Sequence, residues 1–256
     1  MNRSSGRILA LFIIAALCAA APAGAAVKLV WGESWDGPSA SLQNIVNGLV
    51  GTGKINVTTD YLGAKTGDPD PWFWIDSHVS ALLVTEIAGN ANRNQVGWYL
   101  ESGAKPVLKN DGLHDGLIFD GPASSGATAL VTFSGPMTKF GFYLNPNGPG
   151  DATNAPEPEM FYTNRTLNDL GPDGSGTIHN PWGGDVQALI YDISPYFGDN
   201  TWLVCFEDLD SGANPGPYGT AQTDNDWNDF VFKVTAYGAT PVEKLSFGAL
   251  KVRYQH

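Results

Sequence analysis

Two hydrophobic runs enclose an acidic loop in the segments TWLVCFEDLD (residues 201–210) and DNDWNDFVF (residues 224–232). Both runs contain the β-branched and aromatic residues that favour strands, and the segment between them is rich in glycine and proline. The pattern therefore predicts two strands that pair as a hairpin. Such pairing would bring the acidic residues at both ends of the loop close together.

The side chains that this hairpin would gather are oxygen donors: Glu207, Asp208, Asp210, Asp224, Asp226, Asn228 and Asp229. Calcium takes about six to eight oxygen ligands, whereas zinc prefers nitrogen and sulfur, so we expect a bound Ca²⁺. The spacing in residues 224–228 begins like an EF-hand loop. However, Asp229 stands where that loop needs glycine, and Thr235 stands where it needs a bidentate glutamate, which excludes an EF-hand. The alternative is that these residues only cap turns and solvate a loop.

The alternation of short strand-like runs and turns continues through the chain, which contains 31 glycines and 17 prolines. Strands are predicted at residues 27–31, 55–59, 81–87, 95–100, 116–119, 129–133, 139–144, 159–163, 186–191, 201–206 and 230–236. So many short strands predict an all-β fold, a β-sandwich or jelly roll. Apolar residues at Leu42, Ile45, Val46 and Leu49 have helical spacing and predict one short accessory helix near the N-terminus. We expect that helix to plug an edge or an end of the sandwich.

The N-terminal residues have the composition of a bacterial-type secretory signal peptide. Arg3 and Arg7 precede an apolar run at 8–21, and small residues follow at Ala23 and Ala25. We therefore predict a signal peptide at 1–25, one β-sandwich domain at 27–238 and a C-terminal tail at 239–256. Lipidation at Cys18 is an alternative that the preceding leucine disfavours.

The charge of the chain indicates which partners to expect. Its formal net charge is −12, and removal of the two signal-peptide arginines brings it to −14. Such a surface repels nucleic acid and anionic membranes. No segment after the signal peptide approaches the roughly 20 apolar residues of a membrane-spanning helix. Without the signal peptide Cys205 is the only cysteine, so no intramolecular disulfide is expected in the exported protein.

No catalytic motif is apparent in the sequence, so we expect a non-enzymatic protein. The four histidines, His78, His114, His179 and His256, lack the spacing of metal ligands, and no nucleophile motif is present. Paired carboxylates leave a glycoside-acting enzyme as a remote alternative.

Tryptophans support a different alternative, a carbohydrate-binding module. Trp72, Trp74 and Trp182 are the candidate glycan contacts, because exposed aromatic rings stack on sugar faces. Aromatic side chains more often belong to a core, where they bury a large area. Exposure of these three rings would distinguish the two interpretations.

The acidic segment resembles the C-terminal signature of domain-of-unknown-function family 4114, found in exported bacterial proteins including PEP-CTERM-like relatives. The resemblance rests on residues 206–209 and 224–232, and extends to 42–46, 86–89, 94–99 and 139–144. It implies a secreted β-sandwich of surface or matrix proteins without an established activity, and by analogy favours calcium at Asp208, Asp224, Asp226, Asn228 and Asp229. Unlike PEP-CTERM proteins, the tail has no apolar span after Pro241.

These observations together predict a secreted or cell-surface protein with a structural calcium site that serves surface or matrix structure, or adhesion. The expected partners are cell-surface or matrix components, polysaccharide among them, and self-assembly remains open. Nucleic acid is not expected.

Overall fold

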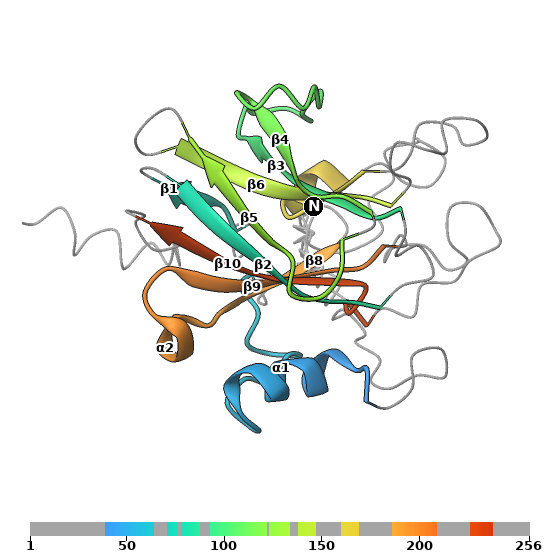
Figure 1. Ribbon diagram of the computed structural model, residues 1–256, viewed down its shortest axis with the longest axis vertical. Coiled ribbons are helices and arrows are strands. Elements are labelled where there is room, and N and C mark those ends of the chain that lie inside the picture. Colours follow the sequence, from blue (N-terminus) through green and yellow to red (C-terminus); the bar gives the residue numbers. More distant parts are fainter. Residues whose placement is uncertain are drawn as a thin grey trace, which may run out of the picture.

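A computed structural model describes residues 39–63, 71–75, 78–87, 93–121, 123–133, 138–146, 160–168, 186–208 and 226–237. In these residues the chain forms two antiparallel sheets and a short N-terminal helix that lies on one of them (Figure 1). The predicted all-β sandwich with one accessory helix is thereby confirmed. The predicted signal peptide at 1–25, the strand at 27–31 and the tail at 239–256 lie outside the described residues.

The first sheet has the strand order β1-β6-β3-β4, with β7 paired to β6. Its strands are β1 (Phe73–Ile75), β3 (Gln95–Leu100), β4 (Asp115–Phe119), β6 (Thr138–Asn145) and β7 (Phe161–Tyr162). The second sheet has the order β5-β2-β10-β9-β8. Its strands are β2 (His78–Glu86), β5 (Thr128–Thr132), β8 (Ala188–Asp192), β9 (Thr201–Phe206) and β10 (Phe230–Tyr237).

The main core lies between the two sheets and is rich in phenylalanine. Phe142 of β6 and Phe232 of β10 come from opposite sheets, and their rings meet edge to face with centroids 5.3 Å apart. Phe73 makes a similar contact with Trp202 of β9, at 5.4 Å. Edge-to-face contacts of this kind are favourable because the positive ring edge meets the negative ring face.

The helix α1 (Leu42–Val50) covers the outer face of the second sheet (Figure 1). Its buried Leu42 and Val46 belong to a second cluster with Leu203 of β9 and Val231 of β10. The expectation that the helix plugs an edge or an end is therefore wrong. Both faces of β9 are apolar, so its outer face also needs a cover, and the apolar side of α1 supplies it.

Several short elements differ from the sequence prediction. The predicted strand at 55–59 is a turn, where Asn56 Oδ1 accepts the backbone N–H of Thr58 and Asp60 Oδ2 accepts that of Asn56. Side chains that bond their own backbone in this way favour turns over strands. The strand β1, the helix α2 (Ser194–Phe197) and the 3-10 helix η2 (Arg165–Asn168) were not predicted, because they are too short for a periodic pattern.

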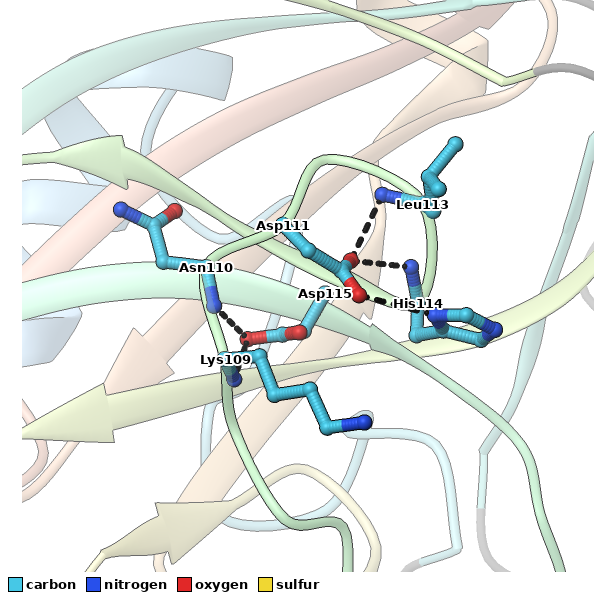
Figure 2. A network of polar contacts seen from close by, with 6 residues as sticks. All are labelled: Lys109, Asn110, Asp111, Leu113, His114 and Asp115. Carbon is cyan, nitrogen blue, oxygen red and sulfur yellow. Dashed lines mark hydrogen bonds and ion pairs between the residues drawn. The ribbon is translucent and has the colours of Figure 1, made fainter.

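Two aspartates shape the connection between β3 and β4 (Figure 2). Asp115 Oδ2 accepts the backbone N–H groups of Lys109, at 2.8 Å, and Asn110, at 2.7 Å. Asp111 accepts two further backbone N–H groups, and Nδ1 of His114 lies 2.9 Å from its Oδ2. The side-chain bond to His114, followed by the backbone bonds, lowers the pKa of Asp111 well below its usual range. N–H groups of the protein therefore hold the carboxylates of both Asp111 and Asp115.

Within the described residues, neither α-helix is long and apolar enough to cross a membrane.

Gly97 in β3 provides a test of the packing on the outer face of the first sheet. A Cβ atom at this position would overlap both the ring of Tyr143 and the carbonyl oxygen of Gly116. Since the neighbouring backbone cannot yield as a side chain can, we expect Gly97→Ala to lower the free energy of unfolding by about 1–3 kcal/mol. Urea denaturation measures this loss.

The control is Gly48→Ala in α1, where an added Cβ meets nothing within 4 Å. This change should raise the free energy of unfolding by about 0.5–1 kcal/mol, because alanine is the better helix former. A Gly97→Ala variant as stable as the parent would show that the sheet does not pack as described.

Candidate metal centre

The pairing of β9 with β10 brings the acidic residues that flank these strands to the same end of the sheet. Phe206, the last residue of β9, pairs with Phe230, the first residue of β10, and the two strands are antiparallel. The predicted pairing of these two segments is thereby confirmed. Glu207 and Asp208 therefore leave the sheet where the chain from Asp226 to Asp229 enters it. We call the region formed by residues 207–208 and 226–229 the acidic corner.

Three carboxylates meet at the acidic corner. One oxygen each of Glu207, Asp226 and Asp229 lie within 4.8 Å of one another. All three side chains are buried, with exposed fractions of 1%, 2% and 8% respectively. Calcium–oxygen distances of about 2.3–2.6 Å allow two ligands of one ion to be up to about 5 Å apart. The spacing of the three carboxylates is therefore compatible with one bound cation.

Backbone groups of the corner itself hold these carboxylates in place. Asp229 Oδ2 accepts the N–H of Asp208 at 2.8 Å, across the strand pair. Asp226 Oδ1 accepts the N–H of Asn228 at 3.2 Å, and Asp226 Oδ2 accepts the side-chain amide of Asn228. The same amide of Asn228 donates to the carbonyl of Ala40 at 3.0 Å, which joins the corner to the segment before α1.

Trp227 anchors the segment that carries Asp226 and Asn228. Its ring is fully buried in the cluster beneath α1, and Nε1 donates to the carbonyl of Val186 at 3.1 Å. Its backbone has a φ of 54°, and its N–H is directed at Glu207 Oε2, 3.5 Å away. The left-handed backbone at a buried tryptophan lets the residues on either side keep their polar side chains in the corner.

Burial and mutual repulsion oppose ionisation in the acidic corner. Burial, followed by the charges of Glu207, Asp208 and Asp226, raises the pKa of Asp229 well above its usual value, against a lowering by the backbone bond from Asp208. This is the reverse of Asp111 in Figure 2, whose hydrogen bonds lower its pKa. A divalent cation among the carboxylates would favour their charged forms by direct attraction.

Two residues that the sequence analysis missed lie beside the corner. Glu86 is the last residue of β2 and pairs with Phe230. The residue after it, Ile87, donates its N–H to the carbonyl of Asp229 at 3.0 Å. Asn94 Nδ2 donates to Asp208 Oδ2 at 3.0 Å. Burial raises the pKa of Glu86 to about 8; hydrogen bonding from Asn94 opposes this shift and the Asp208 charge adds to it.

These pKa shifts predict how the metal-free protein depends on pH. A carboxyl group whose pKa is higher in the folded state than in the unfolded state holds its proton more tightly when folded. Its contribution to stability is complete below the usual carboxyl pKa and is lost as the pH rises through the folded value, which is about 8 for Glu86. The pKa values of Glu86 and Asp229 are both raised in the folded state, so both groups make the folded state less stable as the pH rises.

We therefore expect metal-free protein to be more stable to urea at about pH 5.5 than at about pH 8.5. Glu86→Gln should reduce this difference, because glutamine does not titrate. Calcium should also reduce it, because the ion favours the deprotonated groups that the higher pH produces. A metal-free stability that rises over this pH range would contradict the assignment.

The remaining predicted site residues fall into two groups. Asp210, Asp224 and Trp182 lie outside the described residues, as does the side chain of Trp74, whose backbone belongs to β1. Trp72 is half-buried: the Lys139 ammonium lies 4.8 Å from its ring centroid, and Tyr99 contacts the ring at 5.9 Å. A protein group therefore covers one face of this ring.

Comparison of the chain with family models, with curated proteins and with solved structures finds no match. The interpretation of the acidic corner thus depends on its own geometry and chemistry.

Proposed function

We propose that this chain is a non-enzymatic secreted or cell-surface protein in which calcium binds the acidic corner and stabilises the end of the β-sandwich. The observation that carries the proposal is the buried trio of Glu207, Asp226 and Asp229, with oxygens within 4.8 Å of one another. Buried carboxylates are costly unless they are paired with a counter-charge, and a bound cation provides one.

The chemistry of the trio favours calcium over other common ions. It offers carboxylate oxygens without histidine or cysteine, which suits a hard cation and not zinc. Magnesium usually keeps several of its waters and is bound through only one or two carboxylates, whereas calcium accepts a buried shell of protein oxygens. Asn228 and the predicted ligands Asp210 and Asp224 are further oxygen donors for this shell.

The role that we propose for the ion is structural. The ends of β9 and β10 converge at the corner, so an ion bound there would hold the two strand ends together against carboxylate repulsion. The predicted signal peptide supports export to a medium where calcium is available, and the acidic composition favours the attraction of cations. Extracellular calcium modules bind with dissociation constants of about 10⁻⁴–10⁻³ M, which suits a stabilising ion of surface, matrix or adhesion proteins.

Thermal unfolding of residues 27–256 tests the proposal, with excess calcium, with a chelator, and with magnesium as the control ion. An ion at 100 times its dissociation constant stabilises the folded state by about 2.7 kcal/mol. For a chain of this length that corresponds to a rise in Tm of roughly 5–10 °C. Identical melting in calcium and in chelator would contradict the proposed function.

A further inference from the structure

A buried amide beside the acidic corner has an oxygen without a hydrogen-bond partner. Asn94 precedes β3 of the first sheet, and its side chain is fully buried. Its Nδ2 donates to Asp208 Oδ2 at 3.0 Å, which places the carboxamide at the corner. Among the described residues, no hydrogen-bond donor reaches Asn94 Oδ1. Since buried polar atoms are nearly always bonded, an unpaired carbonyl oxygen here indicates an additional ligand.

Glu86, at the end of β2, has a second buried side-chain oxygen without a hydrogen-bond partner. Its Oε1 is buried and, in the described part of the chain, also lacks a hydrogen-bond donor. The Glu86 carboxyl interacts with both Asn94, by hydrogen bonding, and Asp208, by charge repulsion. The carboxylates of Glu86 and Asp208 therefore lie on either side of the Asn94 carboxamide, whose N–H group now contacts them.

We propose that Glu86, Asn94 and Asp208 form a second calcium position next to the one at Glu207, Asp226 and Asp229, and that its ion joins the two sheets. The inference builds on the proposed function, because both ions belong to one acidic corner. The Asn94 N–H that now contacts Asp208 supplies the positive charge density that the cation replaces. Rotation of the carboxamide, whose O and N ends have nearly the same shape, directs Oδ1 to the ion.

Two features favour a second ion over a larger shell around the first. The carboxylates whose oxygens all lie within 4.8 Å of one another include neither Asp208 nor Glu86, in the part of the chain that the structure describes. In addition, when the five carboxyl groups of Glu86, Glu207, Asp208, Asp226 and Asp229 are all ionised, one divalent cation compensates only two of their negative charges. A second divalent cation leaves a single net negative charge.

The second position also differs from the first in the elements that it connects. Glu86 ends β2 and Asp208 follows β9, both in the second sheet, whereas Asn94 leads into β3 of the first sheet. The first position joins two neighbouring strands of one sheet. An ion at the second position would instead hold the two layers of the sandwich together at this end.

Calcium stoichiometry tests the proposal, measured by isothermal titration calorimetry and by native mass spectrometry on residues 27–256. The parent protein should bind two calcium ions, and Glu86→Gln should bind one. Asn94→Asp retains an oxygen ligand and adds a charge, so its second calcium should bind about tenfold more tightly, while its Tm in chelator should fall. If Asn94 were only a hydrogen-bond donor to Asp208, Asn94→Asp would lower the Tm in both conditions and leave calcium affinity unchanged.

The matched control is Asp115→Asn, which removes a buried carboxylate that backbone N–H groups hold outside the corner (Figure 2). This variant should still bind two ions. Two ions retained by Glu86→Gln would overturn the second position. One ion bound by the parent would overturn it while leaving the proposed function in place, and no bound ion would overturn both.

Discussion

Replacement of Asp226 by asparagine is expected to remove the calcium-dependent part of the thermal stability. Asparagine has the shape of aspartate and can still accept the backbone N–H of Asn228. It loses only the hydrogen bond from the Asn228 side-chain amide, so the fold should persist. The trio loses one of its three charges, and we expect the calcium affinity to fall at least about a hundredfold. The rise in Tm on addition of calcium, which is worth about 2.7 kcal/mol at 100 times the parent dissociation constant, should then disappear.

The Tm of Asp226→Asn in chelator distinguishes the loss of a calcium ligand from a general loss of stability. Without calcium, Asp226→Asn relieves repulsion among buried carboxylates, so its Tm in chelator should equal or exceed that of the parent protein. Asp111→Asn is the matched control, because it removes the same charge from the loop in Figure 2 and should leave the calcium response intact. A full calcium response in Asp226→Asn would show that the ion, if bound, does not use this residue.

Replacement of Trp227 by alanine is expected to cause the largest loss of stability. The ring is fully buried beneath α1 and its Nε1–H bonds the carbonyl of Val186, so the change leaves a large cavity and an unpaired carbonyl. Truncation of buried aromatic residues costs about 3–5 kcal/mol. Urea denaturation in chelator measures this loss without a contribution from the ion.

The same variant should also weaken calcium binding, because Trp227 positions its neighbours Asp226 and Asn228. Trp227→Phe keeps most of the ring and should cause a smaller loss of both stability and affinity. Phe197→Ala is the control for an aromatic residue near the surface. That ring is 40% exposed and packs against the Lys233 ammonium at 4.5 Å, so its loss should cost no more than about 1 kcal/mol. Equal losses in Trp227→Ala and Phe197→Ala would refute the anchoring role of Trp227.

The strands that the sequence predicts best are those with long, continuous patterns. The predicted bounds 95–100 and 201–206 coincide with β3 and β9, and the pairing of β9 with β10 follows the expected hairpin. The prediction worked there because β-branched and aromatic residues fill whole strands and turn residues separate them. The three residues of β1 are too few to show such a pattern, and the sequence favours a glycan contact for their one tryptophan, Trp74, instead.

In the acidic corner, too, the sequence predicts contacts between residues of one strand pair, but not contacts with residues from other parts of the chain. The sequence alone predicts that Glu207, Asp226 and Asp229 lie close together, because they flank one pair of strands. It does not predict this for Glu86 and Asn94, since Glu86 reaches the corner only through the pairing of β2 with β10, and Asn94 only through the packing of the first sheet on the second. Nothing in the residues around either position indicates those contacts.

The sequence by itself determined the class of the fold, the short helix and the presence of a dense set of oxygen donors between β9 and β10. Each of these depends on residues within one element or one pair of elements, where propensity, spacing and turn chemistry act locally. Only the tertiary structure decided that α1 covers the outer face of the second sheet and that Glu86 and Asn94 border the acidic corner. The physical reason is that the order of strands and the packing of layers minimise exposed apolar area over the whole chain.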